Sequence, residues 1–241
     1  MNNNEVFTAA LIVAAGSGTR FGAGDLPKQY APLLGRAVMR RAVDVFAAHP
    51  AIGHVCIVIQ PEHRAFCETA LAALPAEKYS IVDGGMTRQQ SVLRGLESLA
   101  PRAPRHVLIH DAARPCVTAA LVNRVCDALN GGAQAVIPAL PITDTIKKRR
   151  EADGPVTTQN REGLFTVQTP QGFAFENILS LHRKHADESL TDDAALLEHA
   201  AQSPAFVAGD RGNIKITYAE DISIAEGILA AAHGDIRTGK G

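Results

Sequence analysis

The sequence predicts an α/β fold in which a mostly parallel sheet carries helices on both faces. Short runs of small and branched apolar residues alternate with segments of helical periodicity from Ala9 to Ile137. Such alternation at short spacing is typical of parallel sheets with crossover helices. Polar or glycine-rich motifs directly follow three of the runs, where such sheets bind ligands. We therefore expect a Rossmann-like arrangement in a single domain, residues 1–241.

The first part of the chain holds most of the expected sheet. The strands are expected at 9–13, 55–59, 80–82, 107–109 and 135–137, with helices at 37–48, 61–74, 86–99 and 121–129. The first run lacks polar alternation, which indicates a strand buried on both faces. His49-Pro50 and Gly131-Gly132 each end a helix.

The pattern changes at Pro138. Pro138 and Pro141 cannot continue a helix and poorly suit a central strand. A basic run at 147–150, interpreted as a solvated face, leads to a turn and further extended segments. We expect a protruding β-arm at about 139–168, inserted in the domain. Because a hairpin with little core is marginally stable alone, the arm predicts a partner subunit.

The remaining residues return to alternating elements. Helices are expected at 175–185, 191–200 and 219–232, and a strand at 205–208; Thr191, Asp192 and Asp193 would cap the second of these helices. Lys215 faces opposite the isoleucines on either side of it. His182 and His185 share a helix face but have no further ligand at clear metal-binding spacing, so we expect surface histidines.

Composition argues against several classes of function. The chain has a formal net charge of −1 and no Trp, so neither a basic field nor a stacking platform favours nucleic acid. The apolar run 9–15 is too short to span a bilayer, and the first residues lack the positive region of a signal peptide. Four cysteines without a CxxC pair are typical of reduced thiols. We expect a cytoplasmic protein with no membrane or nucleic-acid partner.

The stretch from Ala14 to Tyr30 predicts a polyphosphate site. Glycines at 16 and 18 let backbone N–H groups approach a ligand, and Arg20 and Lys28 supply fixed cations. A P-loop would need Lys followed by Ser or Thr, and a dinucleotide fingerprint would need a glycine where Phe21 stands. The turn therefore indicates a different nucleotide loop.

Asp111 follows the fourth expected strand and is a candidate Mg²⁺ ligand. Mg²⁺ favours one or two carboxylates together with phosphate oxygens and water. Arg114 could hold a second anionic group, whereas Cys116 is interpreted as a packed residue. The sequence has no GxSxG motif. These residues suit phosphoryl or nucleotidyl transfer by positioning and charge neutralisation, with the nucleophile supplied by the substrate.

A set of motifs resembles one known family over most of the chain. They are AAGSGTRFG, PKQY, VDGG followed by RQQSV, HDAARP, TPQ, LTDDA and NIKIT. Their order and spacing are similar to those of the 2-C-methyl-D-erythritol 4-phosphate cytidylyltransferases of the non-mevalonate isoprenoid pathway. The resemblance implies a nucleotidyltransferase-type fold and attack of methylerythritol phosphate on the α-phosphorus of CTP. The products would be 4-diphosphocytidyl-2-C-methyl-D-erythritol and pyrophosphate.

The resemblance also implies the roles of individual residues. Arg20, Lys28 and Lys215 would be catalytic, and Asp111 would meet Mg²⁺ and the substrate. The nucleotide-binding residues would be Ala14, Ala15, Gly16, Gly18, Asp83, Gly84 and Ser91. The substrate-binding residues would be Asp111, Arg114, Thr145, Arg161, Thr169 and Thr191.

In the family the arm reaches over a second subunit and helps to bind its substrate. The resemblance therefore implies a homodimer with arm exchange, with Thr145 and Arg161 on the arm. The residues 210–212 depart from the family's form, which affects only that loop. Because the chain ends soon after the last expected helix, we expect no downstream cyclase domain of the kind fused to some relatives.

Three alternatives remain open from the sequence. A cytidylyltransferase of the same fold acting on ribitol 5-phosphate, or a similar alditol phosphate, would share most of the motifs. A sugar-1-phosphate nucleotidyltransferase using UTP or GTP is disfavoured by HDAARP. A nucleotide-binding regulatory protein would not need Arg20, Lys28, Asp111 and Lys215 together.

Overall fold

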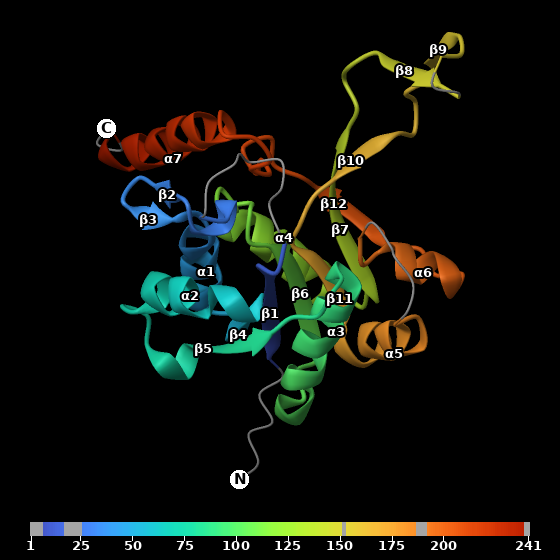
Figure 1. Ribbon diagram of the computed structural model, residues 1–241. Helices are drawn as coiled ribbons and strands as arrows, with labels where there is room; N and C mark the ends of the chain where they lie inside the picture. Colours follow the sequence, from blue (N-terminus) through green and yellow to red (C-terminus); the bar gives the residue numbers. More distant parts are fainter. Residues whose placement is uncertain (1–6, 17–25, 151–152, 187–191, 239–241) are drawn as a thin grey trace.

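The computed structural model describes residues 7–16, 26–150, 153–186 and 192–238 of the chain (Figure 1). Its central sheet has the strand order β10-β7-β11-β6-β1-β4-β5, and β12 pairs with β7. The strands are β1 (Thr8–Val13), β4 (Ile52–Ile59), β5 (Tyr79–Asp83), β6 (His106–Asp111), β7 (Ala135–Pro141), β10 (Phe165–Val167), β11 (Gln171–Ala174) and β12 (Ala205–Ala208).

Most neighbouring strands of the sheet run parallel. β1 pairs in parallel with β4 and β6, β4 with β5, and β12 with β7. β11 runs antiparallel between β6 and β7, and β10 is antiparallel to β7. The predicted mostly parallel sheet is therefore confirmed, although β11 was not expected. Its few residues include Gln171 and Gly172, and glycine is depleted in strands.

Helices cover both faces of the sheet. α1 (Val38–Ala48), α2 (Arg64–Leu71) and α4 (Ala119–Asn130) pack with Ala10 and Ile12 of β1 in one core cluster. α3 (Arg88–Leu99), α5 (Phe175–Lys184) and α6 (Ala195–His199) pack with Ala9 and Leu11 in the other. Alternate residues of β1 are thus buried on opposite sides, as its uninterrupted apolar run predicts.

A third cluster lies beneath α7, at the upper left of Figure 1. α7 (Asp221–Thr238) contributes Ala225, which packs with Ile216 and with Leu33 of the small hairpin β2 (Pro32–Leu33) and β3 (Arg36–Ala37). Because Ile216 packs in this cluster, the segment that carries Lys215 is fixed against α7.

Four short 3-10 helices are also present in the described part of the chain. They are η1 (Lys28–Tyr30), η2 (Pro61–His63), η3 (Ala76–Lys78) and η4 (Ala100–Arg102).

The expectation that Pro138 poorly suits a central strand was wrong. β7 runs through Pro138 and pairs on both sides. Proline lacks a donor but keeps its acceptor, and the Pro138 carbonyl accepts a hydrogen bond from the backbone N–H of Gln168 at 2.8 Å. The strand therefore continues to Pro141 before the chain leaves the sheet.

The chain between β7 and β10 forms a hairpin that stands away from the body (Figure 1). β8 (Ile146–Arg149) and β9 (Val156–Gln159) pair only with each other within the described residues. Their side chains are almost all exposed, the basic ones included. A protruding arm is thus present, while its packing on a partner stays a prediction.

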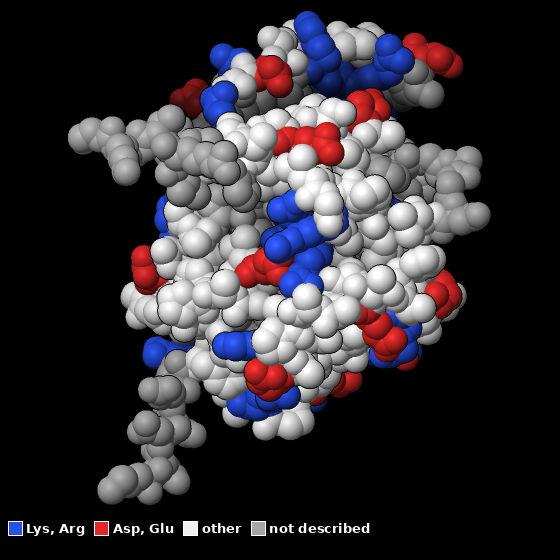
Figure 2. All heavy atoms as spheres, turned by 90° about the vertical axis from the view of Figure 1, so that its left-hand side faces the viewer, with Lys and Arg blue, Asp and Glu red and all other residues white. Residues whose placement is uncertain are grey.

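Figure 2 shows basic side chains gathered at the centre of one face beside acidic ones, with more basic side chains at its upper edge, while most of the face is uncharged. Among the residues that the structure describes, none of the helices combines the length and hydropathy that a membrane span needs.

Candidate active site

A cleft of about 400 Å³ lies at the carboxyl ends of the strands. Its lining comes from the turn after β1, from η1, from the segments after β4 and β5, from the end of β6 and from the segment before α7. The lining residues are Val13, Ala14, Ala15, Gly16, Lys28, Gln29, Gln60, Met86, Thr87, Arg88, Asp111, Ala112, Ala113 and Lys215. Motifs that are far apart in the sequence therefore meet in one site.

Two glutamines hold the backbone of the turn after β1. The Gln29 side-chain amide donates to the carbonyls of Ala14 at 2.8 Å and Gly16 at 3.1 Å. The Gln60 amide donates to the carbonyl of Ala15 at 2.8 Å. Because these carbonyls are engaged, the turn is fixed before any ligand arrives. Neither glutamine was assigned a role from the sequence, although Gln29 lies within PKQY.

Lysines flank the cleft from two separate segments. Lys28 opens η1, and its Nζ donates to the carbonyl of Ile216 at 2.8 Å. Lys215 precedes that residue, and its Nζ lies 2.8 Å from Asp111 Oδ2. The carbonyl of Ile216 thus ties the turn carrying Lys28 to the segment carrying Lys215. Both predicted catalytic lysines line one cavity.

Asp111 is a partly buried carboxylate among cations, with 14% of its side chain exposed. Burial alone would raise its pKa, but the charges of Lys215, Arg88 and Arg114 outweigh burial and lower it to about 2. Arg114 Nε lies 3.7 Å from Asp111 Oδ2, and Arg88 Nη2 lies 3.9 Å from Oδ1. Asp111 is therefore ionised at neutral pH and holds these cations close together.

Arg88 was missed from the sequence, although it opens the RQQSV motif. Its Nη2 lies 2.6 Å from Oδ2 of Asp193, whose Oδ1 lies 3.3 Å from His182 Nε2. Burial would lower the Arg88 pKa, but Asp193 raises it; burial would raise the pKa of Asp193, but Arg88 and His182 lower it. The expectation of a surface His182 was wrong, because its ring faces this buried carboxylate.

The expected cap before α6 is made by Asp192. Its Oδ1 accepts a hydrogen bond from the backbone N–H of Ala195 at 3.0 Å, and its Oδ2 accepts from Gln171 Nε2 at 2.9 Å. Asp193, predicted as part of the cap, instead belongs to the buried ion pair with Arg88. The two consecutive aspartates thus have different roles: Asp192 caps α6, and Asp193 pairs with Arg88 of α3.

The predicted base-reading residues lie at the end of β5, where Asp83 and Gly84 stand, and in the first turn of α3, where Ser91 stands. Ser91 is buried; its hydroxyl accepts from the backbone N–H of Gly85 at 3.1 Å and donates to the carbonyl of Thr87 at 2.8 Å. A Cβ on Gly84 would lie 2.9 Å from Ala15 Cβ, so this turn packs against the glycine loop. Asp83 is exposed, and its Oδ1 accepts from Arg64 Nη2 at 2.6 Å.

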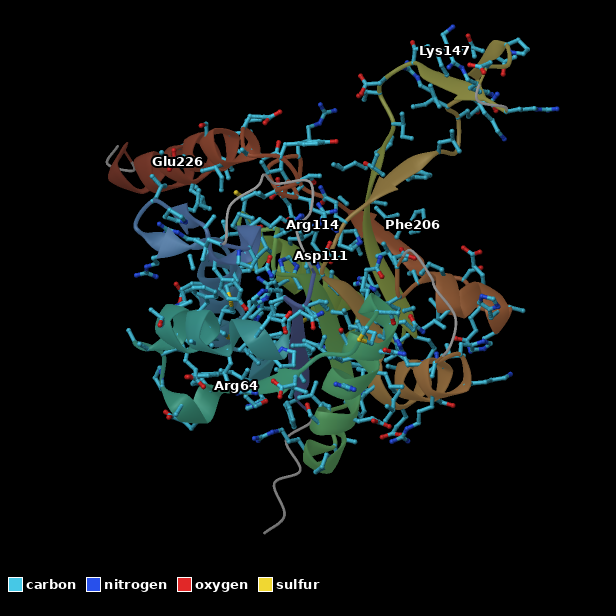
Figure 3. All side chains as sticks on the ribbon, viewed as in Figure 1. Arg64, Asp111, Arg114, Lys147, Phe206 and Glu226 are labelled. Carbon is cyan, nitrogen blue, oxygen red and sulfur yellow. The ribbon has the colours of Figure 1, made fainter. Side chains whose placement is uncertain are left out.

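The structure does not bring all predicted residues into the cleft. Thr145 and Arg161 are exposed on the arm, on either side of the β8–β9 hairpin, and Arg161 donates to the carbonyl of Thr143. Figure 3 shows Asp111 and Arg114 together near the middle of the molecule and Lys147 far away on the arm. Three further predicted residues, Gly18, Arg20 and Thr191, lie outside the described residues.

Asp111 is the only carboxylate among the described residues that line the cleft. The described part of the chain contains no group of three or more acidic, histidine or cysteine side chains arranged to hold a metal. A complete protein-made metal cage is therefore not present there. A lone ionised carboxylate fits the mode in which Mg²⁺ takes most ligands from phosphate and water.

The fold and the cleft define a class, the nucleotidyltransferase-type α/β proteins. The crystal structure of 4-diphosphocytidyl-2C-methyl-D-erythritol synthase from Anaerococcus prevotii DSM 20548 superposes with a TM-score of 0.80 at 30% identity, covering 93% of this chain and 96% of that one. The family model of 2-C-methyl-D-erythritol 4-phosphate cytidylyltransferase, IspD, matches residues 8–231. The chain belongs to this family.

The curated relatives are longer than this chain. The bifunctional enzyme IspD/IspF of Bradyrhizobium sp. ORS 278 is 47% identical over 237 residues, which are 97% of this chain and 59% of that protein. The bifunctional enzyme IspD/IspF of Rhodospirillum rubrum is 49% identical over 234 residues, with the same coverages of 97% and 59%. The chain thus spans about three fifths of the length of these relatives.

Proposed function

We propose that this chain transfers CMP from CTP to 2-C-methyl-D-erythritol 4-phosphate, giving 4-diphosphocytidyl-2-C-methyl-D-erythritol and pyrophosphate. The observation that carries the proposal is the meeting of Lys28, Lys215 and Asp111 in the cleft beside the glycine turn. Membership of the cytidylyltransferase family supports this acceptor over ribitol 5-phosphate. The reaction supplies isoprenoid precursor synthesis.

The chemistry is an in-line displacement that needs no enzyme nucleophile. A phosphate oxygen of the acceptor attacks the α-phosphorus of CTP, and the bond from that phosphorus to the bridging oxygen breaks. Pyrophosphate leaves with the electron pair. Lys28 and Lys215 neutralise the negative charge that builds up on the phosphates, which is the main catalytic device in such transfers. Arg20 adds a further cation by the resemblance.

Asp111 is the residue that would hold Mg²⁺. Its carboxylate is ionised and faces the cleft, and the metal's remaining ligands would come from triphosphate oxygens and water. The bound ion would supply Lewis-acid neutralisation of phosphate charge. Before the metal binds, Lys215 and Arg88 hold this carboxylate in place.

The turn at the end of β5 is the proposed place of the cytosine. A Cβ at Gly84 would lie 2.7 Å from Ser91 Oγ and 3.0 Å from the Ile59 carbonyl, so this turn is closely packed on the body of the protein. By the resemblance, cytosine would be read here, partly through the backbone, by the segment of Asp83, Gly84 and Ser91.

The acceptor side of the site would lie beside Asp111, toward Arg114 and Thr169, and by the resemblance Thr191 would also bind the acceptor. We propose that Thr145 and Arg161 reach the site of a second subunit, which makes the enzyme a homodimer with exchanged arms. Free, buried cysteines at 56, 67, 116 and 126 and the need for CTP support a cytoplasmic location.

The direct test is pyrophosphate release from CTP with Mg²⁺ and either methylerythritol phosphate or ribitol 5-phosphate. Release with the first acceptor alone is the expected result. Release with ribitol 5-phosphate alone would contradict the acceptor while retaining the nucleotide site. No release with either acceptor, from folded protein that binds CTP, would contradict the proposed transfer. UTP and ATP in place of CTP serve as nucleotide controls.

A further inference from the structure

Four residues behind the cleft form a closed ring of hydrogen bonds, in which three side chains bond the backbone carbonyl of the next residue and one bonds its side chain. His110 Nε2 bonds the carbonyl of Arg114 at 3.1 Å, and Arg114 Nη1 donates to the carbonyl of Asn213 at 2.9 Å. Asn213 Nδ2 donates to the carbonyl of Thr169 at 2.8 Å. Thr169 Oγ1 closes the ring on His110 Nδ1 at 3.0 Å.

The ring lies in the protein interior. His110 and Asn213 are fully buried, and Thr169 is 6% exposed. The Arg114 side chain is 13% exposed. Two atoms of the same residues that the ring does not use, Asn213 Oδ1 and Arg114 Nε, have no hydrogen-bond partner among the described residues. Breaking one of the ring's bonds would leave a buried polar atom unpaired, which costs its full desolvation. The ring is therefore strongly fixed in one arrangement.

The bonds determine which tautomer His110 adopts. The Arg114 carbonyl can only accept, so Nε2 of the neutral imidazole carries the proton and donates. Nδ1 is then an acceptor, and the Thr169 hydroxyl donates a hydrogen bond to it. The Thr169 oxygen remains free to accept from the backbone N–H of Asp111, which lies 3.1 Å away. Every donor and acceptor in this part of the ring is thereby matched.

The ring connects the two segments that carry Asp111 and Lys215. Asp111 is joined to Thr169 through its own backbone, and Lys215 follows Asn213 by two residues. The backbone N–H of Ile216 donates to the Ala113 carbonyl at 2.8 Å, which fixes the other side of Lys215. The 2.8 Å contact between Lys215 and Asp111 is held by these links.

We infer that His110 is a positioning residue for CMP transfer, which acts through the ring by holding Asp111 and Lys215 in register. Arg114 and Thr169 act in the same way, through the polar atoms that the ring uses. The inference rests on the proposed function. His110 does not itself line the cleft, so its role would be indirect.

The test compares His110→Phe with His106→Phe. Both histidines are buried residues of β6 and lie on the same face of the strand, because they are four residues apart. Only His110 belongs to the ring. The His110 variant is expected to lose turnover roughly tenfold to a hundredfold, the scale expected for a displaced catalytic group, at little changed CTP affinity. The His106 variant keeps turnover. Equal turnover in the two folded variants would overturn the inference.

Thr169 separates positioning from substrate contact. Thr169→Val should lose turnover as His110→Phe does, whereas Thr169→Ser, which keeps the hydroxyl, should retain wild-type turnover. The double variant of His110→Phe and Thr169→Val should be no less active than the less active of the two single variants, because both residues act through one ring. Turnover losses that multiply in the double variant, or a raised KM for the acceptor in Thr169→Ser, would contradict the role of the ring. Where His110→Phe does not fold, His110→Asn replaces it, because Asn retains an acceptor for Thr169 and loses the bond to Arg114.

A substrate-free measurement keeps this inference distinct from the proposed function. Nitrogen NMR of the wild-type imidazoles should show His110 as the neutral Nε2–H tautomer. The Nδ1–H tautomer would refute the ring even in an active enzyme. Wild-type protein that shows this tautomer but transfers no CMP would refute the proposed function instead.

Discussion

Asp111 gathers positive charge before a ligand arrives. Its carboxylate lies within 4 Å of Lys215, Arg88 and Arg114, at 2.8, 3.9 and 3.7 Å. Without this anion, the cations would repel each other in a partly buried site. A triphosphate can then meet cations that are already in place, which is the meaning of preorganisation in phosphoryl chemistry.

Alanine substitutions at two glycines of the site are expected to have opposite effects on stability and on CTP binding. At Gly84 a Cβ would meet the Ile59 carbonyl at 3.0 Å and Ala15 Cβ at 2.9 Å, so Gly84→Ala should lower the free energy of unfolding by about 1–3 kcal/mol. At Gly16 a Cβ would meet no described atom within 4 Å. Gly16→Ala should therefore fold with wild-type stability and bind CTP more weakly, since the methyl group enters the phosphate space.

Urea denaturation and CTP titration of the two variants check this pair, each variant serving as the other's control. Wild-type stability of Gly84→Ala would contradict the packing of that turn. Wild-type CTP affinity of Gly16→Ala would contradict a phosphate beside Gly16.

The sequence shows only part of the site at this scale. Lys28 and Asp111 can be found because they follow expected strands, whereas Lys215 was assigned a role only by the resemblance. Gln60, Arg88 and His110 act through contacts with residues distant in sequence, for which a single chain offers no local signal. The motifs RQQSV and HDAARP contain Arg88 and His110, but the resemblance alone gave neither a role.

At the scale of elements, an ion pair joins the helices beside the cleft. Arg88 begins α3, Asp193 precedes α6, and His182 lies in α5. Both Asp193 and His182 are fully buried. The cleft-facing arginine is thus held by the packing of helices that have no other part in the site.

Asp193→Asn should lower the free energy of unfolding at pH 7 by about 3 kcal/mol, the scale for breaking a buried ion pair. The folded-state pKa of Asp193 is lowered, so its stabilisation is present above the ordinary Asp pKa of about 4 and is lost as the pH falls below that value. The wild type should therefore lose stability in acid more steeply than the variant.

Urea denaturation from pH 7 to pH 3 measures this difference. Asp127→Asn, at an exposed position of α4, is the control and should match the wild type throughout. A constant gap between wild type and Asp193→Asn across this range would show that the carboxylate charge does not carry the effect.

Elements with strong local patterns were predicted, and those made by tertiary context were not. β1 and β12 were placed within a residue of their observed bounds. β11 is formed because β6 and β7 offer pairing edges on both sides, which its own residues do not show. β7 continues through Pro138 because the neighbouring chain bonds its carbonyl.

For the whole molecule, the arm and the cleft lie apart in one chain (Figure 3). If Thr145 and Arg161 serve a site, that site belongs to another copy. A mixture of Arg161→Ala and Lys28→Ala chains should then recover activity, because each mixed dimer has one site with both wild-type parts. With random exchange, about a quarter of all sites are intact.

Pyrophosphate release after mixing and re-equilibration checks the shared site, with each variant alone as the inactive reference. A mixture no more active than the separate variants would contradict arm exchange and leave the cleft of the single chain unaffected.

The most direct test of the cleft as the place of CMP transfer is pyrophosphate release by Lys28→Ala and Lys215→Ala at saturating CTP, Mg²⁺ and methylerythritol phosphate. Lys78→Ala, at an exposed position outside the cleft, is the matched control. We expect turnover to fall about a hundredfold or more in the first two variants and to stay at the wild-type level in the third. Near wild-type turnover in folded Lys28→Ala and Lys215→Ala would contradict the account.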